Sequence, residues 1–184
     1  MVAVRAGGAG LLAAAPVSSC TSGSPDDPLP TTASGDDVVC GIATKDVETA
    51  TGLEVGRVVG DLSDMVDDDG TRVCEVWPVD QDVVDGAIVV VRMVPTTSAA
   101  GAALREQVDA AGPSTDPPEE VFDGIEAAGW LGTGAEADTG GGTVVLVSGQ
   151  TAIKVTTASS SAGRDALDDA LALAQQVASA PMDS

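Results

Sequence analysis

The sequence contains no histidine and no tyrosine. Both are common general acids and bases, and histidine usually activates a serine or cysteine nucleophile. A carboxylate pair can do similar work, but the chain has 29 Asp and Glu residues, so no particular pair stands out. We therefore identify no catalytic residue and expect no enzyme. A carboxylate-dependent hydrolase of envelope polymers is the catalytic alternative.

Metal-binding patterns are also lacking. Without histidine, two paired thiols supply only half of a tetrahedral ligand set. An acidic segment ends in Asp69-Gly70, but aligning Gly70 with the glycine of a calcium loop puts Met65 at the first ligand position and Val76 at the last. We expect an acidic turn there, and neither a metal ion nor another cofactor.

Basic residues are scarce. Eight Lys and Arg face 29 Asp and Glu, giving a formal net charge of −21. Such a charge repels phosphate backbones and anionic headgroups, and the few cations are scattered along the chain. We therefore expect no nucleic acid as a partner. Solubility explains the acidity, and attraction of cations or of a basic partner is the sharper alternative.

Aromatic residues amount to two Trp and one Phe, so the 43% hydrophobic content comes mainly from Ala and Val. Clustered valines favour strands. Trp77 and Trp130 are candidate lining residues of an apolar ligand pocket, because such pockets use large apolar side chains. The alternative is that each tryptophan fills the core.

The N-terminus has the outline of a signal peptide. One basic residue, Arg5, precedes a small and apolar run over residues 6–17 that is too short to span a membrane as a helix. The run ends in Val17-Ser18-Ser19-Cys20, which resembles the bacterial lipobox. The resemblance implies cleavage before Cys20, diacylglycerol on the Cys20 thiol, and anchoring at the extracytoplasmic face of the cell membrane.

Residues 21–37 are rich in Pro, Ser, Thr, Gly and Asp. Such a stretch cannot bury enough apolar surface to offset its ordering entropy, so we expect a disordered stalk. The predicted organisation is a signal peptide over 1–19, a lipidated cysteine and stalk over 20–37, and a single α+β domain over 38–181.

The chain has three cysteines. If Cys20 carries lipid, Cys40 and Cys74 remain as a pair. Outside the cytoplasm they would form a structural disulfide that closes a loop of about 35 residues and contributes about 3 to 4 kcal/mol in the chain-entropy model. A metal site and a redox pair are the competing interpretations, although redox cysteines are usually close in sequence.

Hydrophobic periodicity and turn residues predict the order of the elements. Helices are expected at residues 45–51, 98–111 and 163–179. Strands are expected at residues 53–60, 71–79 and 86–94, weakly around 119–130, and in a hairpin of 143–147 and 151–156. Thr44 is the expected N-cap of the first helix, and Gly52 ends it.

The strand at 86–94 is apolar on both faces apart from Arg92. This pattern favours a central strand covered on both sides, or a strand with one packed face and one face lining a groove. The sequence therefore predicts an α+β fold: a mainly antiparallel sheet of about five to seven strands, helices mostly on one face, and one disulfide.

The pattern Cys40-Gly41-Ile42-Ala43-Thr44, then Gly52-Leu53 and Cys74-Glu75-Val76-Trp77, resembles a family of small actinobacterial lipoproteins known only as a domain of unknown function. These proteins share a lipobox, a Ser/Thr/Pro stalk, and a second cysteine just before a tryptophan. The resemblance implies an envelope location and a disulfide, and brings no activity. Family members have the tryptophan two residues after the cysteine. Here it is three, which in a regular strand puts the two on opposite faces.

These features predict a membrane-anchored extracytoplasmic lipoprotein that acts as a ligand-binding or protein-interaction module. Besides the membrane, its partner would be a small apolar ligand, a wall component or an envelope protein. A purely structural accessory lipoprotein is a further alternative. A tryptophan-floored pocket would favour binding, paired carboxylates with raised pKa values in a cleft would favour the hydrolase, and a flat apolar patch would favour the accessory role.

Overall fold

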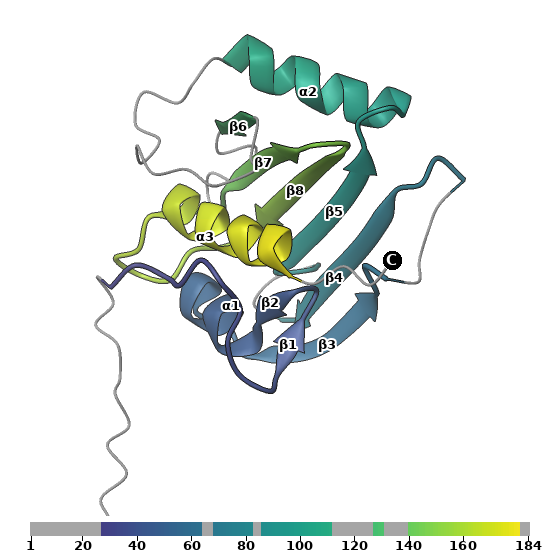
Figure 1. The fold of residues 1–184 in the computed structure, drawn as a ribbon. Coiled ribbons are helices and arrows are strands. Elements are labelled where there is room, and N and C mark those ends of the chain that lie inside the picture. The colour runs from purple at the N-terminus through teal and green to yellow at the C-terminus, as the bar shows by residue number, and fades with distance from the viewer. Residues whose placement is uncertain (1–26, 64–67, 83–85, 112–126, 131–139, 181–184) are drawn as a thin grey trace, which may run out of the picture.

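The main sheet has six antiparallel strands in the order β3-β4-β5-β8-β7-β6 (Figure 1). The computed structural model describes residues 27–63, 68–82, 86–111, 127–130 and 140–180, with only the backbone for 107–111 and 127–130. The strands are β3 (Val55–Gly60), β4 (Arg72–Pro78), β5 (Val89–Pro95), β6 (Ala127–Trp130), β7 (Thr143–Ser148) and β8 (Thr151–Thr157). The predicted α+β fold is confirmed. Of the weak strands expected around 119–130, β6 is one, and 119–126 lie outside the described residues.

In the described ranges three helices cover the sheet: α1 (Thr44–Thr51), α2 (Ala99–Ala111) and α3 (Ala166–Ser179). We call the face under α1 and α3 the core face, because their apolar side chains pack there with residues such as Leu146 and Ile153. Leu104 of α2 packs instead on Val145, Val147 and Ala152, on the opposite or outer face. Two of the three helices thus share one face, and α2 lies on the other (Figure 1).

The structure corrects the predicted starts of two helices, α1 and α3. The predicted N-cap Thr44 is already the first residue of α1, and its Oγ1 is buried without a hydrogen bond. Ala43 holds the cap position, and tertiary contacts replace a capping side chain: the Thr44 N–H donates to the Asp37 carbonyl at 3.0 Å. Helix α3 begins at 166 instead of 163, because Asp165 caps it by accepting the N–H groups of Leu167 and Asp168.

A small hairpin of β1 (Val38–Val39) and β2 (Ile42–Ala43) opens the domain, and the sequence patterns did not predict it. Its turn residues Cys40 and Gly41 have φ values of 53° and 77°. Positive φ at both positions suits a tight hairpin turn but is unfavourable for a residue with a Cβ atom. Cys40 is the only non-glycine residue with positive φ in the described ranges, so its conformation depends on tertiary support.

Gln176 of α3 is fully buried and joins three other parts of the domain. Its Nε2 donates to Asp46 Oδ2 at 2.9 Å and to the Pro30 carbonyl at 2.8 Å, and its Oε1 accepts the Ala43 N–H at 3.0 Å. Leu29, next to Pro30, is 9% exposed and belongs to the core. Part of the stretch that composition assigns to the stalk therefore packs against the domain.

Replacing Gln176 with methionine should destabilise the domain by about 3 kcal/mol or more, because a buried carboxylate, an N–H and a carbonyl would all lose their partner. Gln175→Met is the matched control. Gln175 is also buried, but its Oε1 has no hydrogen-bond partner, so its loss should cost little or be stabilising. Urea unfolding of both variants measures the difference, and equal losses would contradict the role assigned to Gln176.

Candidate functional site

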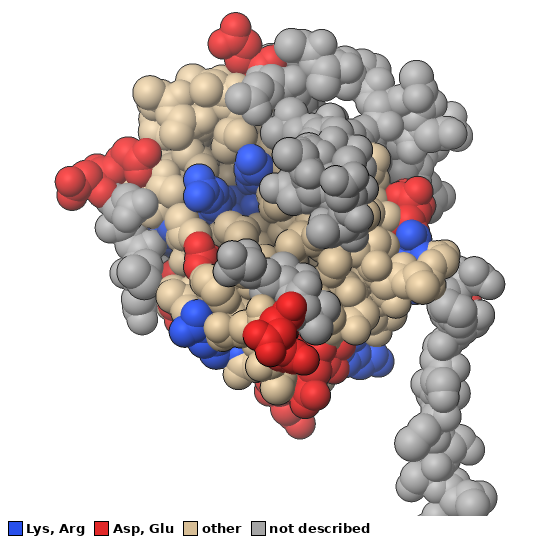
Figure 2. Space-filling view, turned by 180° about the vertical axis from the view of Figure 1, so that it is seen from behind, with Lys and Arg blue, Asp and Glu red and all other residues tan. Residues whose placement is uncertain are grey.

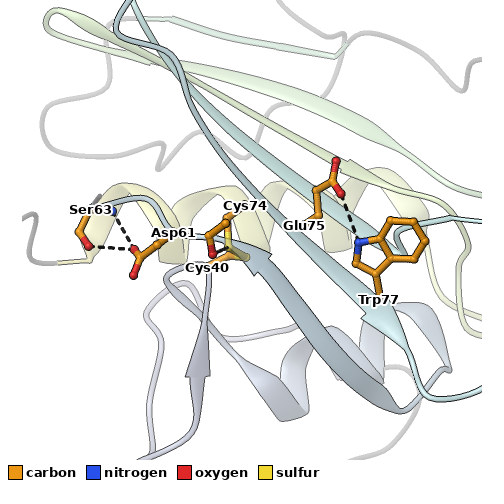
Figure 3. The surroundings of a disulfide bond; sticks show 7 residues. Cys40, Asp61, Ser63, Cys74, Glu75 and Trp77 are labelled. Carbon is orange, nitrogen blue, oxygen red and sulfur yellow. Dashed lines mark hydrogen bonds between the residues drawn. A yellow bond between two sulfur atoms is a disulfide. The ribbon is translucent and has the colours of Figure 1, made fainter. Parts of the chain in front are cut away.

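Cys40 and Cys74 form the predicted disulfide, with an S–S distance of 2.01 Å and a Cα–Cα distance of 5.6 Å (Figure 3). The bond ties the turn of the β1–β2 hairpin to β4. Cys74 is 1% exposed and lies on the core face. Neither sulfur is left as a thiol for a metal ion, so the pair does not form the metal site considered as an alternative. The proposed lipid acceptor Cys20 lies outside the described residues.

Trp77 lies on the outer face of β4, opposite to Cys74, as the three-residue spacing predicts for a regular strand (Figure 3). The register of β3 shifts between Val55 and Arg57, which places Arg57 across from Trp77. The Arg57 guanidinium carbon stands 4.4 Å from the Trp77 ring centroid, and the indole N–H donates to Glu75 at 3.2 Å. The ring is half-buried under this arginine and does not fill the core.

The structure does not bring the two tryptophans together. Trp77 is on β4 and Trp130 on β6, and three strands lie between them in the sheet. At about 4.8 Å per strand their backbones are roughly 19 Å apart. The structure describes only the backbone of Trp130, so a pocket at either tryptophan stays a prediction.

Three carboxylates gather at the start of α3. Burial, together with the charges of Asp165 and Asp169, raises the pKa of Asp168. Both neighbours have structural partners, however: Asp165 caps the helix, and Asp169 forms a buried ion pair with Arg164 at 2.6 Å. None of the three lines either of the recesses that described residues form beside β3 and under α2, so these two recesses give no support to the hydrolase alternative.

Four large apolar side chains are exposed around β3, the edge strand of the main sheet: Val38 of β1 (46%), Val58 (40%) and Val59 (45%) of β3, and Val79 (59%), which follows β4. We call this set the β3 edge. Val58 and Val59 belong to β3, and Val79 donates its N–H to Glu54, just before β3. Val38 and Val58 line a recess of about 300 Å³ beside the disulfide. Within the described residues β3 pairs with β4 alone, so alternate backbone groups on its other side have no strand partner.

Acidic residues stand at both ends of β3. Glu54 precedes the strand and Asp61 follows it, and both are exposed. Asp61 accepts hydrogen bonds from the Ser63 N–H (2.8 Å) and hydroxyl (3.0 Å), which hold the pKa of its carboxyl below the usual value (Figure 3). The β3 edge is therefore negatively charged at its ends, and between them it carries the exposed Val58 and Val59 beside Arg57, whose guanidinium stacks on Trp77.

In comparisons with known proteins, no protein-family model matches the chain and no curated protein is significantly similar to it. The resemblance to actinobacterial lipoproteins therefore stays a prediction. Among the described residues, no helix is both long and apolar enough to cross a membrane. The same residues contain no group of three or more His, Cys, Asp or Glu side chains placed to hold a metal ion.

Reduction of the disulfide should lower the free energy of unfolding by about 3 to 4 kcal/mol, since the bond closes a loop with a sequence separation of 34. Denaturation with and without dithiothreitol measures this loss. The double variants C40A/C74A and C40G/C74A should not respond to dithiothreitol. The glycine variant should be the more stable by about 1 kcal/mol, because glycine tolerates positive φ. A wild-type protein insensitive to reduction would contradict this account.

Proposed function

We propose that the protein is a lipid-anchored extracytoplasmic interaction module that captures an extended segment of an envelope protein along its β3 edge. The observation that carries the docking part is the gathering of all four exposed large apolar side chains of the described residues at this one edge. Exposed apolar groups beside the unpaired side of an edge strand favour aggregation unless another chain covers them.

The anchoring part rests on the N-terminal sequence and is supported by the disulfide. A buried, cross-linked cysteine pair is typical of proteins that fold in oxidising compartments. The third cysteine, Cys20, then carries lipid and leaves no free thiol in the mature chain. Residues 21–26 separate Cys20 from the first described residue, Asp27, whose carbonyl accepts a hydrogen bond from Arg164.

Strand addition is the docking mode that fits this edge. An incoming strand beside β3 would satisfy its outward backbone groups and extend the antiparallel sheet. Side chains of such a strand alternate between the faces. On the core-face side they would meet Val58 and the recess near Val38, and on the outer side they would meet Val59.

The charges at the edge define the partner further. Glu54 and Asp61 favour Lys or Arg at the ends of the incoming segment, with β-branched residues between them. A second copy of this chain is disfavoured, because antiparallel pairing of two β3 strands would bring Glu54 of each copy near Asp61 of the other. The partner is therefore a segment with basic ends and an apolar middle.

A short peptide of alternating valine and threonine with a lysine at each end should bind and slow amide exchange in β3. V58K/V59K should weaken binding by about tenfold or more, since two apolar contacts are lost and two like charges are added. A102K/T49K, which adds the same charge at exposed helical positions, is the matched control. Titration calorimetry and hydrogen exchange measure both effects.

The same peptide with its central residues replaced by proline should not bind, because proline has no N–H group to complete the ladder. Equal binding of the proline peptide, or of V58K/V59K, would rule out strand addition. Concentration-dependent dimerisation that V58K/V59K abolishes would assign the edge to a second copy instead.

Intact mass spectrometry of the native protein, extracted from its own envelope without reduction, should find a chain that begins at acylated Cys20. Its mass should also be lower by two hydrogens for the Cys40–Cys74 bond. Cys20→Ala should leave the membrane fraction while keeping the disulfide. An unprocessed chain with free thiols would overturn both the anchor and the location.

A further inference from the structure

A second surface, on the outer face, places two cations side by side. Arg92 of β5 and Lys154 of β8 are directly opposite each other in the antiparallel register. Both lie on the outer face, because their neighbours Val91, Met93, Ile153 and Val155 pack into the core. Side chains at directly opposed positions have Cβ atoms roughly 5 Å apart, and like charges there are destabilising.

These two cations border a recess of about 330 Å³ between the sheet and α2. Val94 of β5 and Ala100 and Leu104 of α2 supply apolar walls. Figure 2 shows Lys and Arg atoms set into this face of the molecule, whereas many of the Asp and Glu atoms lie toward its margins. The volume is at the lower end of the range for small-molecule sites.

The chain holds α2 close to this face by specific contacts. The Ser98 hydroxyl donates to the Pro95 carbonyl at 2.8 Å and accepts the Gly101 N–H at 3.1 Å, so it caps α2 and ties it to the end of β5. A Cβ atom on Gly101 would stand 2.0 Å from the Pro95 carbonyl oxygen. Glycine at this position is therefore required for the helix to approach the strand and form one wall of the recess.

Neither Arg92 nor Lys154 has an ion pair or a hydrogen bond within the described part of the chain, in a protein with an excess of acidic groups. Other arginines are engaged: Arg164 pairs with Asp169, Arg57 stacks on Trp77, and Arg72 donates to the Leu62 carbonyl. Arg92 and Lys154 can therefore bind an anionic group that comes from outside the protein.

We propose that this recess binds a small organic anion, with a carboxylate or phosphate head between Arg92 and Lys154 and a compact apolar tail against Val94 and Leu104. The planar guanidinium matches two oxygens of such a head, and the ammonium adds a point charge. The negative net charge of the chain does not prevent anion binding here, because acidic groups more than about 8 Å from the bound head are largely screened at physiological salt.

One acidic side chain, Asp69, also borders the recess. Its carboxylate accepts the Thr71 N–H at 2.9 Å, and the hydrogen bonds from Thr71 hold the pKa of Asp69 below its usual value. Asp69 is therefore charged and turned to its own loop, and it forms no ion pair with either cation in the described residues. Its negative charge should weaken the binding of an anion, so removing that charge should strengthen binding, whereas removing the two cations should weaken it.

Octanoate and octyl phosphate serve as probes, with octylammonium and inorganic phosphate as controls, in titrations of the folded protein followed by amide NMR. Both organic anions should shift residues of β5, β8 and α2. R92Q/K154Q should weaken octanoate binding by about tenfold or more. R57Q removes a cation on the same face outside the recess and should leave the affinity unchanged. D69N keeps the Oδ1 acceptor and should increase the affinity.

R92Q/K154Q should be at least as stable as the wild type without probe, because the substitution removes a repulsion. A loss of binding in this variant is therefore not a loss of folding. Equal binding of octanoate and octylammonium, equal binding by R92Q/K154Q and the wild type, or weaker binding by D69N would overturn the proposal. Inorganic phosphate that binds as tightly as octyl phosphate would overturn the role of the apolar walls.

Discussion

The pairing of β5 with β8 is the interaction on which the rest of the structure depends. It joins the meander β3-β4-β5 to the meander β6-β7-β8 through seven residue pairs, from Val89 with Thr157 to Pro95 with Thr151. Because side chains alternate along a strand, this register decides which of them enter the core. It sends Val91 and Val155 under α3, and it places Arg92 against Lys154 on the other face. A slip by one residue would turn one of the two strands over and send its cation, Arg92 or Lys154, to the core face.

The small aliphatic core explains why the chain needs further ties. Core residues are mostly valine, alanine and leucine, and each buries less surface than an aromatic side chain. Polar and covalent links compensate: the disulfide fixes the first hairpin to β4, Gln176 joins three segments, and Arg164 pairs with Asp169. These links all lie on the core-face side, and none of them borders the recess under α2.

The two proposed binding surfaces differ in their physics. At the β3 edge the driving forces are backbone hydrogen bonds and burial of valines, with acidic residues selecting basic ends. In the recess under α2 the driving force is local positive potential in an otherwise acidic molecule, focused by apolar walls. The recess draws its residues from β5, β8, α2 and the loop before β4, and none from β3, so both surfaces can be occupied together.

The sequence by itself determined the three helices, the strands of the main sheet and the two cysteines of the disulfide, but not the β1–β2 hairpin. Valine-rich runs, Gly52 and Gly149 mark strands and turns through local preferences, and the proposed lipidation of Cys20 would leave one possible disulfide. The groove-lining alternative for the strand around Arg92 also follows from its apolar pattern. Only the tertiary structure decided that α2 covers the outer face, that Gln176 binds Pro30 and Asp46, and that Arg92 meets Lys154. Such contacts depend on register and packing between segments far apart in the chain, for which local periodicity carries no signal.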